Sequence, residues 1–256
     1  MRYFFDVIIF DFGSKGKLLV FLFFCSFFVS AQTDNTFTGW GAVFASYKLN
    51  DKFRIHFDGQ LRSTDELEHV QSFLIRPGLN YHASKNIVLT IGYAYVGNRR
   101  VVEMVSDMVP EHRIWEQFIY NQRFKGGYFT SLQHRIRLEE RFIGKSYLKN
   151  GSLVNDGSEF SLRLRYFLRT IFPLQQTENF TDGAFVSLQD ELFVNLDNAP
   201  TLTNGGFFDQ NRAYTSLGWR FNPKFDLEVG YMYQYINGRN VNVNNNIIQL
   251  AAYLRL

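Results

Sequence analysis

Hydrophobic and polar residues alternate one by one along most of this chain after its N-terminal segment. In FRIHFDGQLR (53–62), Phe53 and Ile55 share one face of an extended chain, while Arg54 and His56 share the other. Such alternation is typical of a β-strand with a different environment on each face, and no convincing helical stripe interrupts it. The pattern predicts strands over 38–49, 53–63, 70–81, 87–97, 112–123, 128–142, 159–170, 184–194, 212–221, 225–236 and 246–256.

The lengths of these strands and of their connections favour a membrane. Most strands have about ten residues or slightly more, as a tilted strand needs to cross a bilayer, whereas globular strands are usually nearer five or six. Short connections such as Asn50–Lys52 and Asn222–Lys224 alternate with longer polar ones such as Asn98–Glu111 and Ile143–Ser158. Outer-membrane barrels have short periplasmic turns and long external loops. We therefore predict an all-β fold, a transmembrane antiparallel up-and-down β-barrel.

The number of strands conflicts with this interpretation, because single-chain bacterial barrels have an even number. We expect an even number of strands, ten or twelve, and favour twelve: either a strand is hidden in Arg99–Ser106 or one of the strands above is wrong. A secreted soluble barrel or sandwich is the alternative fold, and it would bury the apolar faces instead. Tyrosine and tryptophan near strand ends, such as Tyr93 and Trp219, favour the membrane, where they suit the interfacial girdles.

The energetics of a bilayer assign the two faces. An arginine facing lipid near the midplane costs about 2–4 kcal/mol, so the three arginines that share one face of 159–170 must line the interior. A barrel of this size is narrow, and side chains of this size could largely fill it. Glu140, His134 and Asp190 fall on the predicted lipid side. The charged residues expected to line the lumen are Arg54, Asp58, Arg62, Arg135, Arg137, Glu139, Arg163, Arg165, Glu191, Arg220, Asp226 and Glu228.

The first 31 residues predict a signal peptide. Lys15 and Lys17 precede the apolar run 18–29, and small residues then suit cleavage after Ala31. An uncleaved membrane anchor is the alternative. The single cysteine, Cys25, lies inside the apolar run, so the mature chain has no thiol chemistry. Residues 32–256 form one barrel domain, and a net charge of +3 gives no support to nucleic-acid binding.

Several phrases resemble a family of Gram-negative outer-membrane barrels catalogued as domain of unknown function DUF2490. These phrases are the early Trp40, GQLR (59–62), RPGLNY (76–81), EHRIWEQ (111–117), RLEERF (137–142), the pair Asn211-Arg212, and GYMYQ (230–234). The resemblance covers roughly 36–256. It implies a barrel in the cell outer membrane of a Gram-negative bacterium, in contact with lipid and inserted by the barrel-assembly machinery. It implies no catalytic residue, because the family has no established activity.

Three functions are compatible with these residues. The leading hypothesis is a narrow pore for small solutes, with anions favoured by the arginines, because rings of charge set selectivity in channels. The second is a structural or surface-binding barrel whose lumen is plugged by arginine–carboxylate pairs. The third is a lipid-modifying hydrolase, for which His82-Ala83-Ser84, His56 and His112 are the candidates by residue type. We expect no catalytic residue, cofactor or metal site, since His82 and Ser84 fall in a tight turn and Glu111 and His112 face opposite ways.

Overall fold

The computed structural model describes residues 9–11, 17–19, 33–124, 131–175, 180–197 and 206–256. The chain divides into two units, Met1–Ala31 and Gln32–Leu256, and each is considered by itself. In the first unit, β1 (Ile9–Asp11) pairs antiparallel with β2 (Lys17–Leu19). Most of the predicted signal-peptide core and the cleavage position lie outside the described residues, so cleavage after Ala31 stays a prediction.

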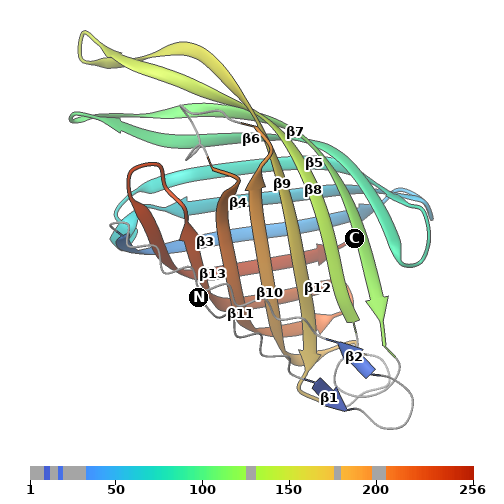
Figure 1. The fold of residues 1–256 in the computed structure, drawn as a ribbon. Helices are drawn as coiled ribbons and strands as arrows, with labels where there is room; N and C mark the ends of the chain where they lie inside the picture. Colours follow the sequence, from blue (N-terminus) through green and yellow to red (C-terminus); the bar gives the residue numbers. More distant parts are fainter. Residues whose placement is uncertain (1–8, 12–16, 20–32, 125–130, 176–179, 198–205) are drawn as a thin grey trace. The chain divides into compact units, whose positions relative to one another are not determined.

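The second unit is a closed β-barrel (Figure 1). Each strand predicted from alternation corresponds to one strand of the barrel, and strands adjacent in sequence pair antiparallel. The all-β barrel is therefore confirmed. The strands are β3 (Thr33–Lys48), β4 (Phe53–Ser63), β5 (Val70–His82), β6 (Ile87–Val102), β7 (Val105–Arg123), β8 (Ser131–Lys149), β9 (Ser152–Pro173), β10 (Gly183–Asn195), β11 (Phe208–Asn222), β12 (Phe225–Ile236) and β13 (Asn242–Arg255).

The expected even strand number, with twelve favoured, is wrong for the described part of the chain, whose barrel has eleven strands. In an up-and-down barrel an odd number makes the first and last strands parallel. Here β13 pairs parallel with β3, from Asn242 opposite Thr33 to Arg255 opposite Ser46. The hidden strand predicted in Arg99–Ser106 is also wrong, because this stretch is the end of β6 and the start of β7.

Two hairpins are much longer than predicted. The expected loops Asn98–Glu111 and Ile143–Ser158 are almost entirely strand, because pairing continues to Val102 opposite Val105 and, in the second hairpin, to the very last pair before the turn. That turn has positive φ at Asn150 (50°) and Gly151 (77°), the backbone of a two-residue hairpin turn that glycine favours. In Figure 1 the β6–β7 and β8–β9 hairpins project beyond the other strands of the barrel. We call this end, where β4 meets β5 and β12 meets β13, the long-loop end, and the opposite end the turn end.

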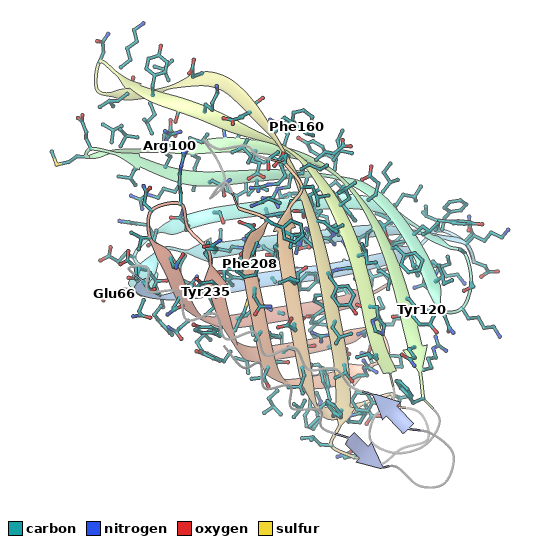
Figure 2. All side chains as sticks on the ribbon, in the orientation of Figure 1. Glu66, Arg100, Tyr120, Phe160, Phe208 and Tyr235 are labelled. Carbon is teal, nitrogen blue, oxygen red and sulfur yellow. The ribbon has the colours of Figure 1, made fainter. Side chains whose placement is uncertain are left out.

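The two faces of the sheet are inverted relative to a soluble barrel. On β4, Phe57 and Leu61 are exposed (38% and 52%), while Asp58 between them is 1% exposed. The same contrast runs around the barrel, and Tyr120 and Phe160, labelled in Figure 2, belong to the exposed outer set. Among the described residues, no helix has the length and apolar character needed to cross a bilayer.

Candidate functional site

The barrel interior is occupied by a network of arginines and carboxylates centred on Glu139 of β8. Glu139 is fully buried and lies within ion-pair distance of five arginines. These arginines come from β5, β7, β8 and β9, so side chains converge on one carboxylate from four strands. The distances from their guanidinium nitrogens to Glu139 are 3.6 Å for Arg76, 3.8 Å for Arg113, 4.0 Å for Arg137, 2.6 Å for Arg163 and 2.5 Å for Arg165.

Further carboxylates extend this network. Glu191 of β10 lies 2.7 Å from Arg165 and 2.8 Å from Arg135. Glu111 of β7 accepts hydrogen bonds from Arg113 and Arg141, at 2.7 and 2.6 Å. Charged hydrogen bonds of this kind are about twice as strong as neutral ones, and they satisfy groups that would otherwise be buried without a partner.

A separate group of charges lies near the turn end. Asp226, the second residue of β12, receives Arg220 at 2.8 Å and Arg255 at 2.5 Å. Two residues along the same strand, Glu228 pairs with Arg169 of β9 and accepts a hydrogen bond from the Ser216 hydroxyl at 2.9 Å. The interior is thus charged along much of its length.

Aromatic rings fill the space between the guanidinium groups. The Trp115 ring is fully buried, and the guanidinium carbon of Arg137 lies 4.6 Å from its centre. Phe193, also fully buried, has Arg165 at 4.5 Å and Arg212 at 4.6 Å. Stacking of arginine on an aromatic face is favourable and strengthens when both are removed from water. Rings and charged groups together leave the middle of the interior without solvent-exposed surface at Glu139 or Trp115.

A family model for a protein of unknown function, DUF2490, matches residues 37–245. The chain belongs to this family. The DUF2490 chain is also similar to an uncharacterised protein of Methylorubrum extorquens, MexAM1_META1p0181, at 25% identity over 199 residues, which is 77% of this chain and 78% of that one. No solved structure matches it.

The residues that alternation assigned to the interior of this DUF2490 barrel all occupy the inward register of their strands. Ten of the twelve form ion pairs with one another or with further charged residues, whereas Arg54 and Arg62, both half-buried, form none among the described residues. Sequence reasoning left other inward charges out of its candidate set. They are Arg76, Glu111, Arg113, Arg141, Arg212 and Arg255, whereas Arg169, predicted inside with the other arginines of its strand, pairs with Glu228.

Several polar groups on the outer face pair with tyrosines. Nδ1 of His112 lies 2.5 Å from the Tyr93 hydroxyl, and Nδ1 of His134 lies 2.8 Å from that of Tyr166. Ser84, proposed as a nucleophile by type, accepts hydrogen bonds from two backbone N–H groups of its own turn, at 3.1 and 3.2 Å. Within the described ranges, no group of three or more His, Cys, Asp or Glu is arranged to hold a metal ion.

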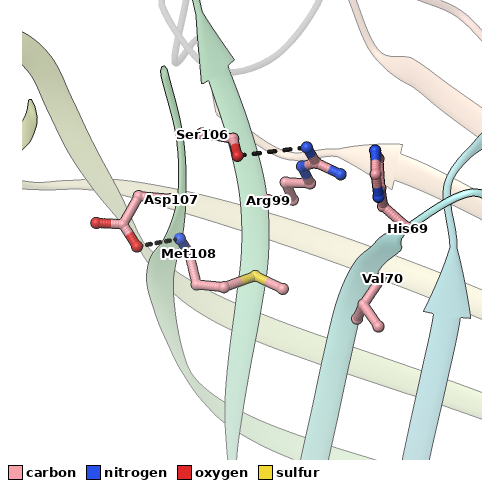
Figure 3. Close-up of a pocket in the computed structure, with 6 residues that line it drawn as sticks. All are labelled: His69, Val70, Arg99, Ser106, Asp107 and Met108. Carbon is pink, nitrogen blue, oxygen red and sulfur yellow. Dashed lines mark hydrogen bonds between the residues drawn. The ribbon is translucent and has the colours of Figure 1, made fainter. Parts of the chain in front are cut away.

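A pocket of about 360 Å³ lies at the base of the β6–β7 hairpin (Figure 3). It is lined by His69 and Val70, where β5 begins, and by residues of β6 and β7. Arg99 reaches across the hairpin to donate to the Ser106 hydroxyl at 3.3 Å, and the Asp107 carboxylate accepts from the Met108 backbone at 2.7 Å. This pocket is at the rim of the barrel and makes no contact with the Glu139 network.

Proposed function

We propose that this DUF2490 protein is an outer-membrane β-barrel with a closed interior that acts as a surface-binding barrel through its long-loop end. The inverted faces support the membrane location. An outer band of exposed leucine, isoleucine, valine and aromatic side chains would be costly in water but suits contact with outer-membrane lipid. Insertion by the barrel-assembly machinery belongs to the same proposal.

The observation that carries the closed interior is the burial of Glu139 among five arginines. Glu139 and Trp115 are 0% exposed and Arg137 is 1% exposed, so water does not reach these three side chains from either end. An ion crossing the barrel would have to separate buried ion pairs, and removing one member of such a pair costs about 3–5 kcal/mol. The network therefore acts as a plug formed by the strands themselves.

The projecting hairpins favour binding at the long-loop end. Met104 at the tip of β6–β7 is 98% exposed, and Val101 beside it is 58% exposed. Tyr147, on the neighbouring β8–β9 hairpin, is 45% exposed. Apolar side chains held above a membrane on paired strands, next to the rim pocket, form a surface suited to contact with another molecule.

A narrow anion-selective pore is the second candidate. It is favoured by the excess of arginine over carboxylate inside the barrel, because rings of like charge select ions of opposite sign. This function requires the ion pairs around Glu139 to rearrange before any ion passes.

Planar-bilayer recording of the refolded full chain tests the proposal. We expect no steady current at any voltage, with insertion verified by resistance of the protein to carbonate extraction from vesicles. Step-like currents whose reversal potential in a salt gradient reports anion selectivity would establish the pore instead. Fractionation of cells that carry the protein should recover it with the outer membrane, and recovery in the soluble fraction would end the membrane proposal.

A further inference from the structure

Two arginines near the long-loop end stand apart from the ion-pair network. The guanidinium carbon of Arg62 lies 4.1 Å from the centre of the Trp40 ring, and that of Arg212 lies 5.0 Å from it. Arg62 is the residue before the last of β4, and Arg212 is four residues after the start of β11. Since both groups contact one ring, they can be no farther apart than these two distances together.

Both guanidinium groups have only neutral hydrogen-bond partners among the described residues. Nη2 of Arg62 donates to the Gln60 amide oxygen at 2.6 Å, while its Nε is buried and donates to nothing. Nη2 of Arg212 donates to the Gln210 amide oxygen at 3.2 Å. Turning over the Gln234 amide would add a second neutral acceptor for Arg212, not a charged one.

The carboxylates nearest in register are already engaged elsewhere. Glu191 is opposite Arg212 on β10 but pairs with Arg135 and Arg165. Asp58, on the same strand as Arg62, pairs with Arg76. The network thus leaves two positive charges without a carboxylate partner, side by side at its long-loop boundary.

Two cations held together over one ring repel each other, and burial makes this repulsion stronger than in water. Stacking on Trp40 offsets only part of the cost, at about 0.5–2 kcal/mol for each cation–π contact. Elsewhere in the described interior, most arginines have a carboxylate within ion-pair distance, although several of them share one. The pair therefore lacks an anion.

We propose that Arg62, Arg212 and Trp40 form a binding site for a small oxoanion, a carboxylate or a phosphate group that enters from the long-loop end. A guanidinium group presents a planar fork of N–H donors that matches two oxygens of such a group, and stacking on the indole holds this fork in place. Arg62 is half-buried beside the end of its strand, so a ligand can reach it without crossing the Glu139 network. The site depends on the barrel interior alone, neither on membrane location nor on a closed lumen.

Isothermal titration calorimetry of the refolded full chain tests this site, with sodium phosphate, sodium acetate and sodium chloride as probes at constant ionic strength. We expect saturable binding of phosphate, acetate or both, and weaker binding of chloride, which cannot accept a fork of two hydrogen bonds. Arg62→Gln and Arg212→Gln should each weaken binding by about ten-fold, the effect of losing one hydrogen bond between charged groups.

The matched control is Arg54→Gln, which removes an inward, half-buried arginine at the turn end without touching Trp40. It should leave oxoanion binding unchanged. Arg62→Lys keeps the charge but loses the fork, so it should also weaken binding while retaining the fold, as judged by heat-modifiable migration. Absence of saturable oxoanion binding, equal binding of chloride, or an equal loss in Arg54→Gln would each overturn the proposal. None of these results bears on bilayer conductance, so the two proposals fail independently.

Discussion

Arg76 on β5 and Glu139 on β8 form an ion pair at 3.6 Å, although β6 and β7 separate their strands in the sheet. Their side chains therefore cross the interior of the barrel. Arg163 of β9 reaches Asp209 of β11 in the same way, at 3.2 Å. Contacts between strands that are not neighbours fill the interior and link distant parts of the sheet. The charges inside the barrel therefore contribute to its stability.

Among replacements of a charged interior residue by a neutral one, the replacement of Glu139 should reduce the stability of the barrel most. Glu139→Gln removes the negative charge that five buried arginines share, so we expect the free energy of unfolding to fall by about 3–5 kcal/mol. Urea titration of the protein folded in lipid vesicles measures this loss. Glu140→Gln, one residue along on the outer face, is the control and should cause no loss. Equal stability of the two variants would mean that the network contributes little.

Because Gly92 has no side chain, the Trp115 ring can pack directly against the backbone at this position. A Cβ at position 92 would lie 2.5 Å from that ring and 2.5 Å from the Pro77 carbonyl oxygen, so Gly92→Ala forces a rigid ring or the backbone to move. We expect a loss of about 1–3 kcal/mol in the free energy of unfolding, typical of an overpacked core. Gly41→Ala is the matched control, because a Cβ at position 41 meets nothing within 4 Å. A loss of the same size in both variants would refute this explanation and point to a general effect of removing glycine from a strand.

A charge on the outer face should be tolerated according to its depth in the bilayer. Val229 lies near the middle of β12 and is 52% exposed, so Val229→Arg should destabilise the protein by about 2–4 kcal/mol in lipid vesicles. Val101, with 58% exposure, lies on the projecting β6–β7 hairpin, and Val101→Arg should cost less than 1 kcal/mol, as expected near or beyond an interface. Two small and equal effects would argue that water, not lipid, surrounds the barrel.

Cysteine pairs can test the parallel contact between the first and last barrel strands. Val43 is directly opposite Ala252 in the β3–β13 pair, and both residues lie on the outer register. In a Cys25→Ser background, Val43→Cys with Ala252→Cys should form a disulfide on mild oxidation, since paired positions have Cα distances that a disulfide can bridge. Val43→Cys with Leu250→Cys, displaced by two residues, should react much less, as seen by migration in non-reducing gels. Preferential reaction of the displaced pair would show a different register or closure.

Alternation predicted every barrel strand because each one separates an apolar outer face from a polar interior. It failed in the hairpin extensions, where Arg99, Arg100 and Asp107 are part of paired strands above the ring. Residues there meet solvent on both faces, so the period-two signal disappears although the hydrogen bonding continues. The parity of the strands was wrong because it was taken from known barrels, and no local pattern encodes whether the two ends of a sheet meet in parallel.

The candidate site was predictable only as a set of inward positions. Alternation assigned Glu139 to the interior, but its five arginines come from four strands, and that convergence follows from barrel closure. Arg76 escaped the candidate set since its inward row on β5 also contains Leu74, which makes the row less clearly polar. The Arg62–Arg212 pair was equally hidden, because Trp40 joins residues that are 150 positions apart in the sequence.

The way these ion pairs span the ring also determines how the protein can assemble. Arg169 on β9 meets Glu228 on β12, and Arg135 on β8 meets Glu191 on β10, so each pair needs intervening strands to be in place. A partly built sheet holds guanidinium groups without their carboxylates and has two unpaired edges, one of them β3, until β13 arrives. A partly formed barrel is therefore unstable for two reasons, its unpaired charges and its unpaired strand edges. We expect folding to be cooperative and to be complete only when β13 pairs with β3.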